Sequence, residues 1–225
     1  MKIILKEKKK LFDDIYEFNF KSDDIVNWIP GQFLQYYIDC KDDGRGTDRF
    51  FTIASSPLEG IIKLTTRFSS KGSSFKKVLK GIKIGTSLNV EGPWGKFTLI
   101  DSYITKKIFF ISGGVGITPF RSIIQDLYLK KEKIDITLLY YNKTSEFIYK
   151  NEFDKNNAIK KSYIIGSVDK ISLLENINVL DNQNSFYYIS GPEGFVKTTE
   201  SIFLNDLNIY KENLKSDFFP GYSKI

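Results

Sequence analysis

The sequence contains no histidine and only one cysteine, Cys40, among its 225 residues. These two counts exclude an intramolecular disulfide, a zinc site of the Cys/His type and an iron–sulfur cluster ligated by cysteines of this chain alone. They also exclude a histidine-ligated haem and any Ser-His-Asp or Cys-His nucleophilic centre. Redox or acid–base chemistry therefore depends on an organic cofactor, or on Lys, Tyr and carboxylate side chains.

Long hydrophobic runs are missing as well. Residues 1–6 (Met-Lys-Ile-Ile-Leu-Lys) lack the apolar stretch of about 7–15 residues that a signal peptide needs. The most apolar stretch, residues 108–112, is followed directly by glycines and is too short to span a membrane. We therefore expect no membrane span and a cytoplasmic location.

Arginine is scarce, so the positive charge of the chain is almost entirely lysine. Lys and Arg number 33 and Asp and Glu number 27, which gives a net charge of +6. A solvated lysine surface explains this excess, and steering of an acidic partner is the alternative. Because the basic residues are dispersed and no nucleic-acid-binding module is recognisable, nucleic-acid binding is not expected.

The composition, with 41% hydrophobic and 15% aromatic residues, is that of a globular protein. Up to a point near residue 103, short runs of β-branched and aromatic residues alternate with turn signals such as Pro30-Gly31 and Gly92-Pro93. This spacing predicts an antiparallel sandwich or barrel, with strands at residues 33–40, 50–54, 61–68 and 87–90. A helix is expected at residues 74–79.

Beyond residue 103 the pattern changes to alternating strands and helices. Strands are expected at residues 107–112, 134–141, 162–166 and 186–190, and helices at residues 118–130, 146–156, 171–177 and 193–207. This order predicts an α/β domain with a doubly wound parallel sheet. The chain therefore divides into two predicted domains, residues 1–102 and residues 103–225.

Two glycine-rich turns come directly after predicted strands of the second domain. Residues 113–119 (Gly-Gly-Val-Gly-Ile-Thr-Pro) open a helix, with Thr118 as its expected N-cap and Pro119 in its first turn. Exposed N–H groups and the helix dipole there favour a pyrophosphate, although the spacing is not Gly-x-Gly-x-x-Gly and a merely tight turn is the alternative. Residues 190–194 (Ser-Gly-Pro-Glu-Gly) form a second turn, which an ordinary turn without a ligand explains equally well. Ligands in open α/β sheets bind at such carboxyl ends, so both turns are expected to line one crevice.

In the first domain, an arginine, aromatic rings and a hydroxyl stand together at Arg49, Phe50, Phe51 and Thr52. Strand alternation directs Arg49 and Phe51 to one face and the other two residues to the opposite face. A guanidinium suits phosphate and a ring stacks on a heterocycle, so the group suits a charged aromatic ligand. An arginine beside a core aromatic residue is the ordinary alternative.

Six segments, in family order, resemble motifs of the ferredoxin–NADP reductase superfamily of flavoproteins. Residues 49–52 are similar to its Arg-x-Tyr-Ser/Thr motif, with Phe51 in place of tyrosine. The other similar segments are the Pro-Gly-Gln-Phe strand entry at 30–33, the phosphate-binding turn at 71–74, Gly-Pro-x-Gly-x-Phe at 92–97, the nicotinamide-nucleotide loop at 113–119, and residues 190–192, where serine replaces the cysteine of a Cys-Gly-Pro turn. The resemblance covers nearly the whole chain.

The resemblance implies a flavin, FAD rather than FMN, held by an N-terminal antiparallel β-barrel and NADPH or NADH held by the C-terminal α/β domain. It implies that Arg49 binds the flavin phosphates, that Phe51 packs on the isoalloxazine and that the Thr52 hydroxyl lies near flavin N5. Thr52 and Ser190 are the implied catalytic residues. The other implied cofactor contacts are Phe50, Thr65, Thr66, Arg67, Gly72, Ser73, Ser74, Gly114, Gly116, Thr118, Gly191, Pro192 and Tyr222. The ordinary alternatives are a core ring for Phe51, a plain strand for residues 65–67 and a helix cap for residues 73–74.

Two departures from the family pattern bear on activity. Phe51 keeps the ring but lacks a phenol, and Ser190 replaces a polarisable thiol. Because hydride transfer depends above all on positioning, activity is expected to remain. The segment 216–222 resembles an acidic-aromatic tail from which Asp217, Phe219 or Tyr222 approaches the flavin, although an ordinary strand end explains it equally well.

Coenzyme choice depends on the residues at the end of the second strand of the α/β domain. An acid usually binds the ribose 2′-hydroxyl, but this strand ends in Tyr-Tyr-Asn-Lys at residues 140–143. Lys143 slightly favours a 2′-phosphate and hence NADPH, although an exposed lysine needs no function.

The implied function is an FAD-dependent NAD(P)H reductase that passes hydride from nicotinamide to flavin and then electrons to an acceptor. The lysine excess suits an acidic ferredoxin or flavodoxin. One alternative is the flavin subunit of a larger complex, such as a dihydroorotate dehydrogenase, but Cys40 alone cannot supply its iron–sulfur ligands. The other is a non-enzymatic basic barrel protein that binds nucleic acid, which leaves the glycine-rich turns unexplained.

Overall fold

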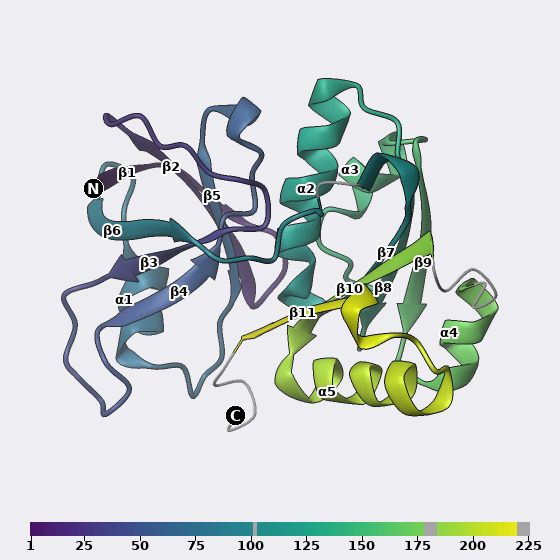
Figure 1. Cartoon of the computed structure of the whole chain (residues 1–225). Coiled ribbons are helices and arrows are strands. Elements are labelled where there is room, and N and C mark those ends of the chain that lie inside the picture. The colour runs from purple at the N-terminus through teal and green to yellow at the C-terminus, as the bar shows by residue number, and fades with distance from the viewer. Residues whose placement is uncertain (101–102, 178–183, 220–225) are drawn as a thin grey trace. The chain divides into compact units, whose positions relative to one another are not determined.

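The computed structural model describes residues 1–100, 103–177 and 184–219, and its elements are labelled in Figure 1. The chain forms two compact units. The barrel unit comprises Met1–Thr98 and Arg121–Leu129, and the α/β unit comprises Leu99–Phe120 and Lys130–Ile225. One helix, α2 (Ile117–Lys130), therefore begins in the α/β unit and contributes most of its length to the barrel unit.

The barrel unit is built on a six-stranded antiparallel sheet in the order β4-β3-β6-β1-β2-β5. Its strands are β1 (Lys2–Lys10), β2 (Ile15–Ser22), β3 (Phe33–Tyr37), β4 (Asp48–Thr52), β5 (Ile62–Arg67) and β6 (Ser87–Trp94). The chain leaving β4 returns to β5, where the N–H of Ala54 donates to the carbonyl of Lys63 at 2.8 Å. This contact joins the two edges of the sheet and confirms the expected antiparallel barrel.

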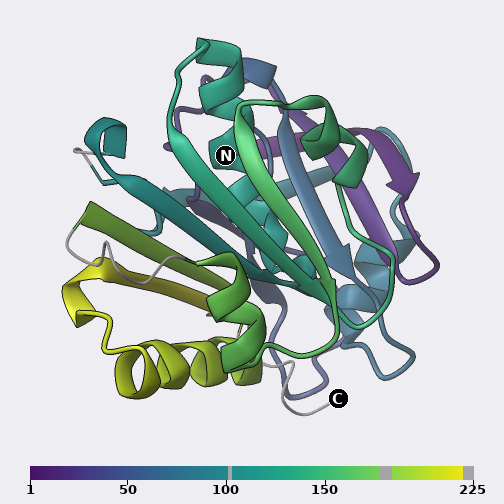
Figure 2. The same ribbon diagram turned by 90° about the vertical axis from the view of Figure 1, so that its right-hand side faces the viewer.

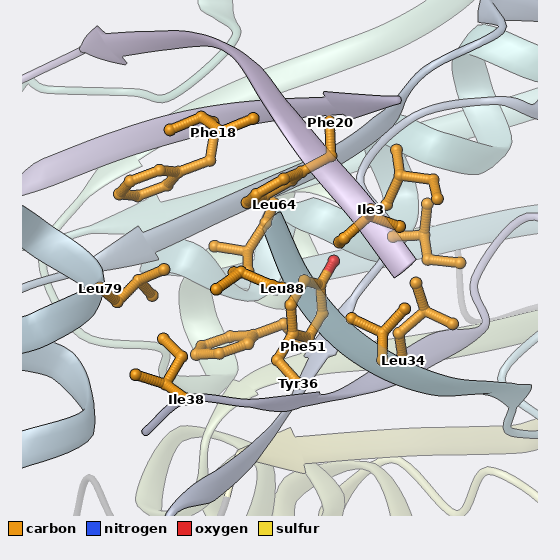
Figure 3. Close-up of a cluster of buried hydrophobic side chains, with 14 of the residues drawn as sticks. Ile3, Phe18, Phe20, Leu34, Tyr36, Ile38, Phe51, Leu64, Leu79 and Leu88 are labelled. Atoms are coloured by element: carbon orange, nitrogen blue, oxygen red, sulfur yellow. The ribbon is translucent and has the colours of Figure 1, made fainter. Parts of the chain in front are cut away.

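Alternating residues of these strands fill the barrel. Figure 3 shows rings from β2, β3 and β4 meeting aliphatic side chains from β1, β5 and β6: Ile3, Phe18, Phe20, Leu34, Tyr36, Phe51, Leu64 and Leu88. Helix α1 (Ser74–Gly81) adds Phe75 and Leu79, which are four residues apart and both buried. Ser73 begins this helix by accepting the N–H of Lys76, as expected of an N-cap serine.

The α/β unit contains a five-stranded sheet in the order β11-β10-β7-β8-β9, in which every neighbouring pair is parallel. The strands are β7 (Lys107–Gly113), β8 (Asp135–Asn142), β9 (Ile159–Ile165), β10 (Ser185–Pro192) and β11 (Leu214–Phe219). Strands β7, β8 and β9 succeed one another outward, whereas β10 lies on the other side of β7. The strand order thus reverses between β7 and β10, where ligands bind in doubly wound sheets.

Helices cover both faces of this sheet. Side chains of α4 (Lys170–Asn176) and α5 (Glu193–Ser201) pack against Phe109, Ile111, Tyr187 and Ile189 of the sheet. Figure 2 shows α5 running along β10 and β11. On the other face, Phe110 stacks on Phe120 of α2 with centroids 4.5 Å apart. The doubly wound arrangement expected from the sequence is confirmed.

Helix α3 (Lys150–Lys155) is shorter than the helix expected at residues 146–156. The Asn142 side chain donates to the carbonyl of Glu146 at 2.8 Å, and the Ile148 N–H donates to the Tyr140 hydroxyl at 3.2 Å. Tyr149 then has a φ of 63°, which ends any continuous right-handed helix. These tertiary hydrogen bonds hold residues 146–149 as a loop. No helix in the described part of the chain is long and apolar enough to cross a membrane.

Candidate functional site

The burial of Arg49, Phe50, Phe51 and Thr52 on strand β4 does not alternate strictly, because Phe51 and Thr52 are both buried. Phe51 is 9% exposed, and its ring centroid lies 5.5 Å from that of Tyr36 and 6.0 Å from that of Phe75. Phe50 lies on the outer face and is 52% exposed. Thr52 is buried. Of the rings in this motif, Phe51 therefore belongs to the barrel core and Phe50 to the surface.

The Arg49 guanidinium lies on the same side of β4 as Phe51. Its carbon is 5.4 Å from the Phe75 ring centroid, and its Nη1 donates to the carbonyls of Gly46 and Asp48. Within the described ranges Arg49 forms no ion pair with a carboxylate. A half-buried cation held over an aromatic ring and hydrogen-bonded to carbonyls is suited to binding an anion.

The three residues of β5 that the sequence predicts as flavin contacts have different surroundings. Thr66 is buried and its hydroxyl accepts a hydrogen bond from the ammonium of Lys76. Thr65 lies on the opposite face of the strand and is also buried. Arg67 forms an ion pair with Asp14 at 3.1 Å. The Thr66 side chain thus contacts helix α1 through Lys76, which lies over the Phe51 ring.

Backbone N–H groups of the turn before α1 form hydrogen bonds with other residues of the barrel unit. The N–H of Gly72 donates to the carbonyl of Ser69 at 3.0 Å, and the Ser73 hydroxyl caps the helix. The N–H of Ser74 donates to the Asp43 carboxylate at 2.8 Å. Arg45 also binds this carboxylate, and together these donors hold the pKa of Asp43 well below its usual range. A carboxylate therefore occupies the position where the sequence predicted phosphate binding.

In the α/β unit, the turn after β7 lies against the end of β10. A Cβ atom on Gly116 would be 2.2 Å from the carbonyl oxygen of Ser190, so only glycine fits there. Gly114 has a φ of 54°, and Gly191 lies beside Gly113. The structure thus brings three predicted residues of the two turns, Gly116, Ser190 and Gly191, together at the reversal of strand order.

Other predicted residues lie farther from this point or have other roles. Helix α2 begins at Ile117, which makes Gly116 its N-cap, so the expected N-cap Thr118 is wrong by two residues; the Thr118 hydroxyl donates to the carbonyl of Val115 at 3.2 Å. Lys143 and Pro192 are exposed. Tyr222 lies outside the described residues.

Ser112 and Ser190 are register partners on β7 and β10, and both are fully buried. Neither hydroxyl has a hydrogen-bond partner within the part of the chain that is described. Asp217 of β11 is the register partner of Ser190 on the other side, and burial raises its pKa to about 6. Because in-register residues of parallel strands share a face, a row of polar side chains crosses β7, β10 and β11 near their carboxyl ends.

Comparisons with known proteins find two domains in the chain. Residues 2–99 match the family model of the oxidoreductase FAD-binding domain, and residues 110–201 match that of the oxidoreductase NAD-binding domain. The chain therefore combines an oxidoreductase FAD-binding domain with an oxidoreductase NAD-binding domain, in a fold that it shares with solved ferredoxin–NADP+ reductases.

The relatives of the chain are distant. The chain is 24% identical to flavohemoprotein A of Dictyostelium discoideum over 99% of its own length and 61% of that protein. It is 30% identical to the glycine betaine monooxygenase reductase subunit of Pseudomonas aeruginosa, over 63% of this chain and 39% of that subunit. The chain thus spans about three-fifths of the flavohemoproteins it matches.

Solved superfamily structures share the fold. The FAD/NAD-binding domain of nitric oxide dioxygenase from Vibrio cholerae aligns with a TM-score of 0.81 at 18% identity, over 97% of this chain and 98% of that one. A ferredoxin–NADP+ reductase mutant from Plasmodium falciparum aligns with a TM-score of 0.83 at 17% identity, over 97% and 95% of the two chains.

Residues of both units fit a flavin and a nicotinamide nucleotide. In the barrel unit, the charge of Arg49 beside the Phe75 ring suits a phosphate attached to a flat ring. In the α/β unit, Gly113, Gly116 and Gly191 bring the two turns together at the reversal of strand order, where nucleotides bind in such sheets. The sequence singled out Arg49 and the two turns, but not Asp43.

Proposed function

We propose that the chain is an FAD-dependent NAD(P)H reductase, with Arg49 and Phe51 among its flavin contacts and Gly114, Gly116, Ser190 and Gly191 among its coenzyme contacts. When bound, the flavin accepts hydride from the reduced nicotinamide and releases electrons to an acceptor. The observation that carries the proposal is the close approach of the two glycine-rich turns at the reversal of strand order, in a chain that matches FAD-binding and NAD-binding domain models.

The protein's own contribution is binding and alignment. Arg49 is proposed to neutralise phosphate charge, and Phe51, which is 9% exposed, to contact the flavin from the barrel core. Gly116 lets the two turns meet, because a Cβ there would lie 2.2 Å from the carbonyl oxygen of Ser190. The Thr52 and Ser190 hydroxyls are proposed to orient the reacting rings, since alignment contributes most to hydride transfer.

Coenzyme choice and acceptor are further parts of the proposal. Lys143 is exposed at the end of β8, where it suits the 2′-phosphate of NADPH. The net charge of +6 favours an acidic electron carrier such as a ferredoxin or flavodoxin. The reductase subunit of glycine betaine monooxygenase is a relative, which supports delivery of electrons to another protein.

The test begins with release and identification of the bound flavin. Anaerobic addition of NADPH or NADH should then bleach the flavin absorption, faster with NADPH. A colourless protein that binds no flavin would refute the proposal. Acceptor reduction should slow strongly as salt increases, because exposed charges are screened, and rates independent of salt would exclude an acidic partner.

A further inference from the structure

We propose that the hydroxyl group of Tyr140 positions the glycine-rich turn after β7 for the coenzyme, through the carbonyl of Gly114. The inference rests on the proposed function, since it requires that this turn contacts a nicotinamide nucleotide. Tyr140 is fully buried on β8. It therefore acts on a ligand through the backbone that it holds, and the sequence motifs assigned it no role.

One hydroxyl joins two turns that follow neighbouring strands of the sheet. The Tyr140 hydroxyl donates to the carbonyl of Gly114 at 2.9 Å, and it accepts the N–H of Ile148 at 3.2 Å. A tyrosine hydroxyl has one hydrogen to donate and lone pairs that accept, so it can form both bonds at once. Gly114 belongs to the turn after β7, and Ile148 belongs to the loop at residues 146–149 after β8. Loss of this single oxygen would therefore release both turns.

The ring of Tyr140 is fixed, so its hydroxyl has a defined position. The ring centroid lies 5.1 Å from that of Phe147 and 6.4 Å from that of Tyr163. Asn142, two residues farther along β8, donates from its side chain to the carbonyl of Glu146 at 2.8 Å. Aromatic packing and this second hydrogen bond thus hold both Tyr140 and the loop that it contacts.

Gly114 needs such a constraint, because a glycine does not hold one backbone conformation by itself. Its φ is 54°, in the left-handed region, and a Cβ atom there would meet nothing closer than 3.9 Å. Backbone conformation, and not lack of space, therefore calls for glycine at this position. Two donors fix the carbonyl of this glycine: the Tyr140 hydroxyl and the N–H of Ile117.

The direction of the Gly114 carbonyl decides what the turn presents to a ligand. This carbonyl and the N–H of Val115 belong to one trans peptide, in which they point in opposite directions. A carbonyl held on Tyr140 therefore directs the Val115 N–H away from that tyrosine, and glycine-rich turns bind anions through such N–H groups. Without the bond the peptide can rotate and present its carbonyl oxygen, whose partial negative charge repels a pyrophosphate.

The experiment compares coenzyme binding by wild type, Tyr140→Phe and Tyr163→Phe, each loaded with flavin. Both variants lose one hydroxyl from the same ring cluster, but the Tyr163 hydroxyl donates to the Asp154 carboxylate of α3 at 2.8 Å. Calorimetric titrations use NADP+, NAD+ and ADP-ribose, which has the pyrophosphate but no nicotinamide. We expect Tyr140→Phe to bind all three about 3- to 10-fold more weakly, as loss of one net hydrogen bond does. Tyr163→Phe should bind them as wild type does.

Kinetics and hydrogen exchange separate positioning of the turn from a general loss of stability. In Tyr140→Phe the KM for the coenzyme should rise by the same factor as its Kd, with a smaller change in kcat. Amide hydrogen exchange of residues 113–117, measured without coenzyme, should be faster in Tyr140→Phe than in Tyr163→Phe or wild type. Thermal unfolding of both variants checks that they fold.

Three results would each overturn the assignment: unchanged coenzyme affinity in Tyr140→Phe, an equal loss in Tyr163→Phe, or unchanged exchange of residues 113–117. If wild type itself bound no coenzyme, the proposed function would fail, whereas the exchange measurement would still report whether Tyr140 holds the turn.

Discussion

Arg121 binds Glu59 through two parallel hydrogen bonds, of 2.8 Å from Nη1 and 2.9 Å from Nη2, and both side chains are largely buried. The same guanidinium donates to the carbonyl of Ala54 at 2.9 Å. Glu59 in turn accepts the N–H of Ser56 at 2.7 Å. Helix α2 thereby fixes residues 54–59, the loop that comes directly after the Arg49–Thr52 motif of β4.

Breaking this pair from one side should destabilise the protein strongly. Arg121→Met leaves the Glu59 carboxylate buried without its cation, and we expect a loss of about 3–5 kcal/mol in the free energy of unfolding. Urea denaturation followed by circular dichroism measures it. The double variant Arg121→Met/Glu59→Leu should be less destabilised than the sum of the two single variants, because it leaves no unpaired charge.

An exposed ion pair provides the matched control. Lys160 and Asp135 lie 3.2 Å apart with side chains 74% and 45% exposed. Lys160→Met should change the free energy of unfolding by about 1 kcal/mol or less. A similar small effect for Arg121→Met would mean that the buried pair does not hold the loop.

Gly116 should tolerate no side chain. In Gly116→Ala the Cβ atom would lie 2.2 Å from the carbonyl oxygen of Ser190, and backbone atoms must move to relieve the clash. We expect a loss of about 1–3 kcal/mol in stability together with weaker NAD(P)H binding, measured by denaturation and by coenzyme titration. Gly194→Ala is the control, because nothing lies within 4 Å of its added Cβ. Equal behaviour of the two variants would contradict the close approach of the two turns.

The hydroxyls of Ser112 and Ser190 should contribute little to folding. Because neither has a partner in the described structure, removing it forfeits no internal hydrogen bond. Ser112→Ala and Ser190→Ala should therefore keep or slightly raise thermal stability in urea or heat denaturation. A clear loss of stability would show that the hydroxyls have internal partners, and unchanged NAD(P)H affinity in Ser190→Ala would remove that residue from the proposed coenzyme site.

Features that depend on nearby sequence were predictable. Helix α1 was expected at residues 74–79 and is found at Ser74–Gly81, since its serine cap and its apolar spacing are local signals. The β7 strand and its glycine-rich turn were predicted for the same reason, and the strand is found at Lys107–Gly113. Strands β1, β2 and β11 were not assigned from the sequence. Many residues of β1 are lysines or acids, which obscure the alternation of a strand.

Features created by tertiary contacts were not predictable. The loop at residues 146–149 depends on Tyr140 and Asn142, which donate or accept hydrogen bonds that no local propensity encodes. The inward position of Lys76 exists only because α1 packs beside β5. Likewise, Ser112 lies beside Ser190 only because β10 pairs with β7. The roles of the named cofactor contacts stay predictions until ligand binding is measured.

Asp217 should make stability fall as pH rises. Burial raises its pKa to about 6 from an ordinary value of 3.8, so the folded protein holds a proton that the unfolded chain has lost. The free energy of unfolding therefore decreases between about pH 4 and pH 6, by at most about 3 kcal/mol, and is constant above that window with respect to this group. Asp217→Asn cannot lose a proton, so its stability relative to wild type should increase through the same window.

Asp154 should change stability with pH in the opposite direction, because Lys150 lowers the pKa of its carboxyl. Asp154→Asn should lose stability at neutral pH, and the loss should vanish in acid. Urea denaturation of the three proteins from about pH 2 to pH 7 measures both effects, because the contribution of Asp154 is lost only below its ordinary pKa of 3.8. A pH-independent difference between Asp217→Asn and wild type would mean that Asp217 is not desolvated in the folded protein.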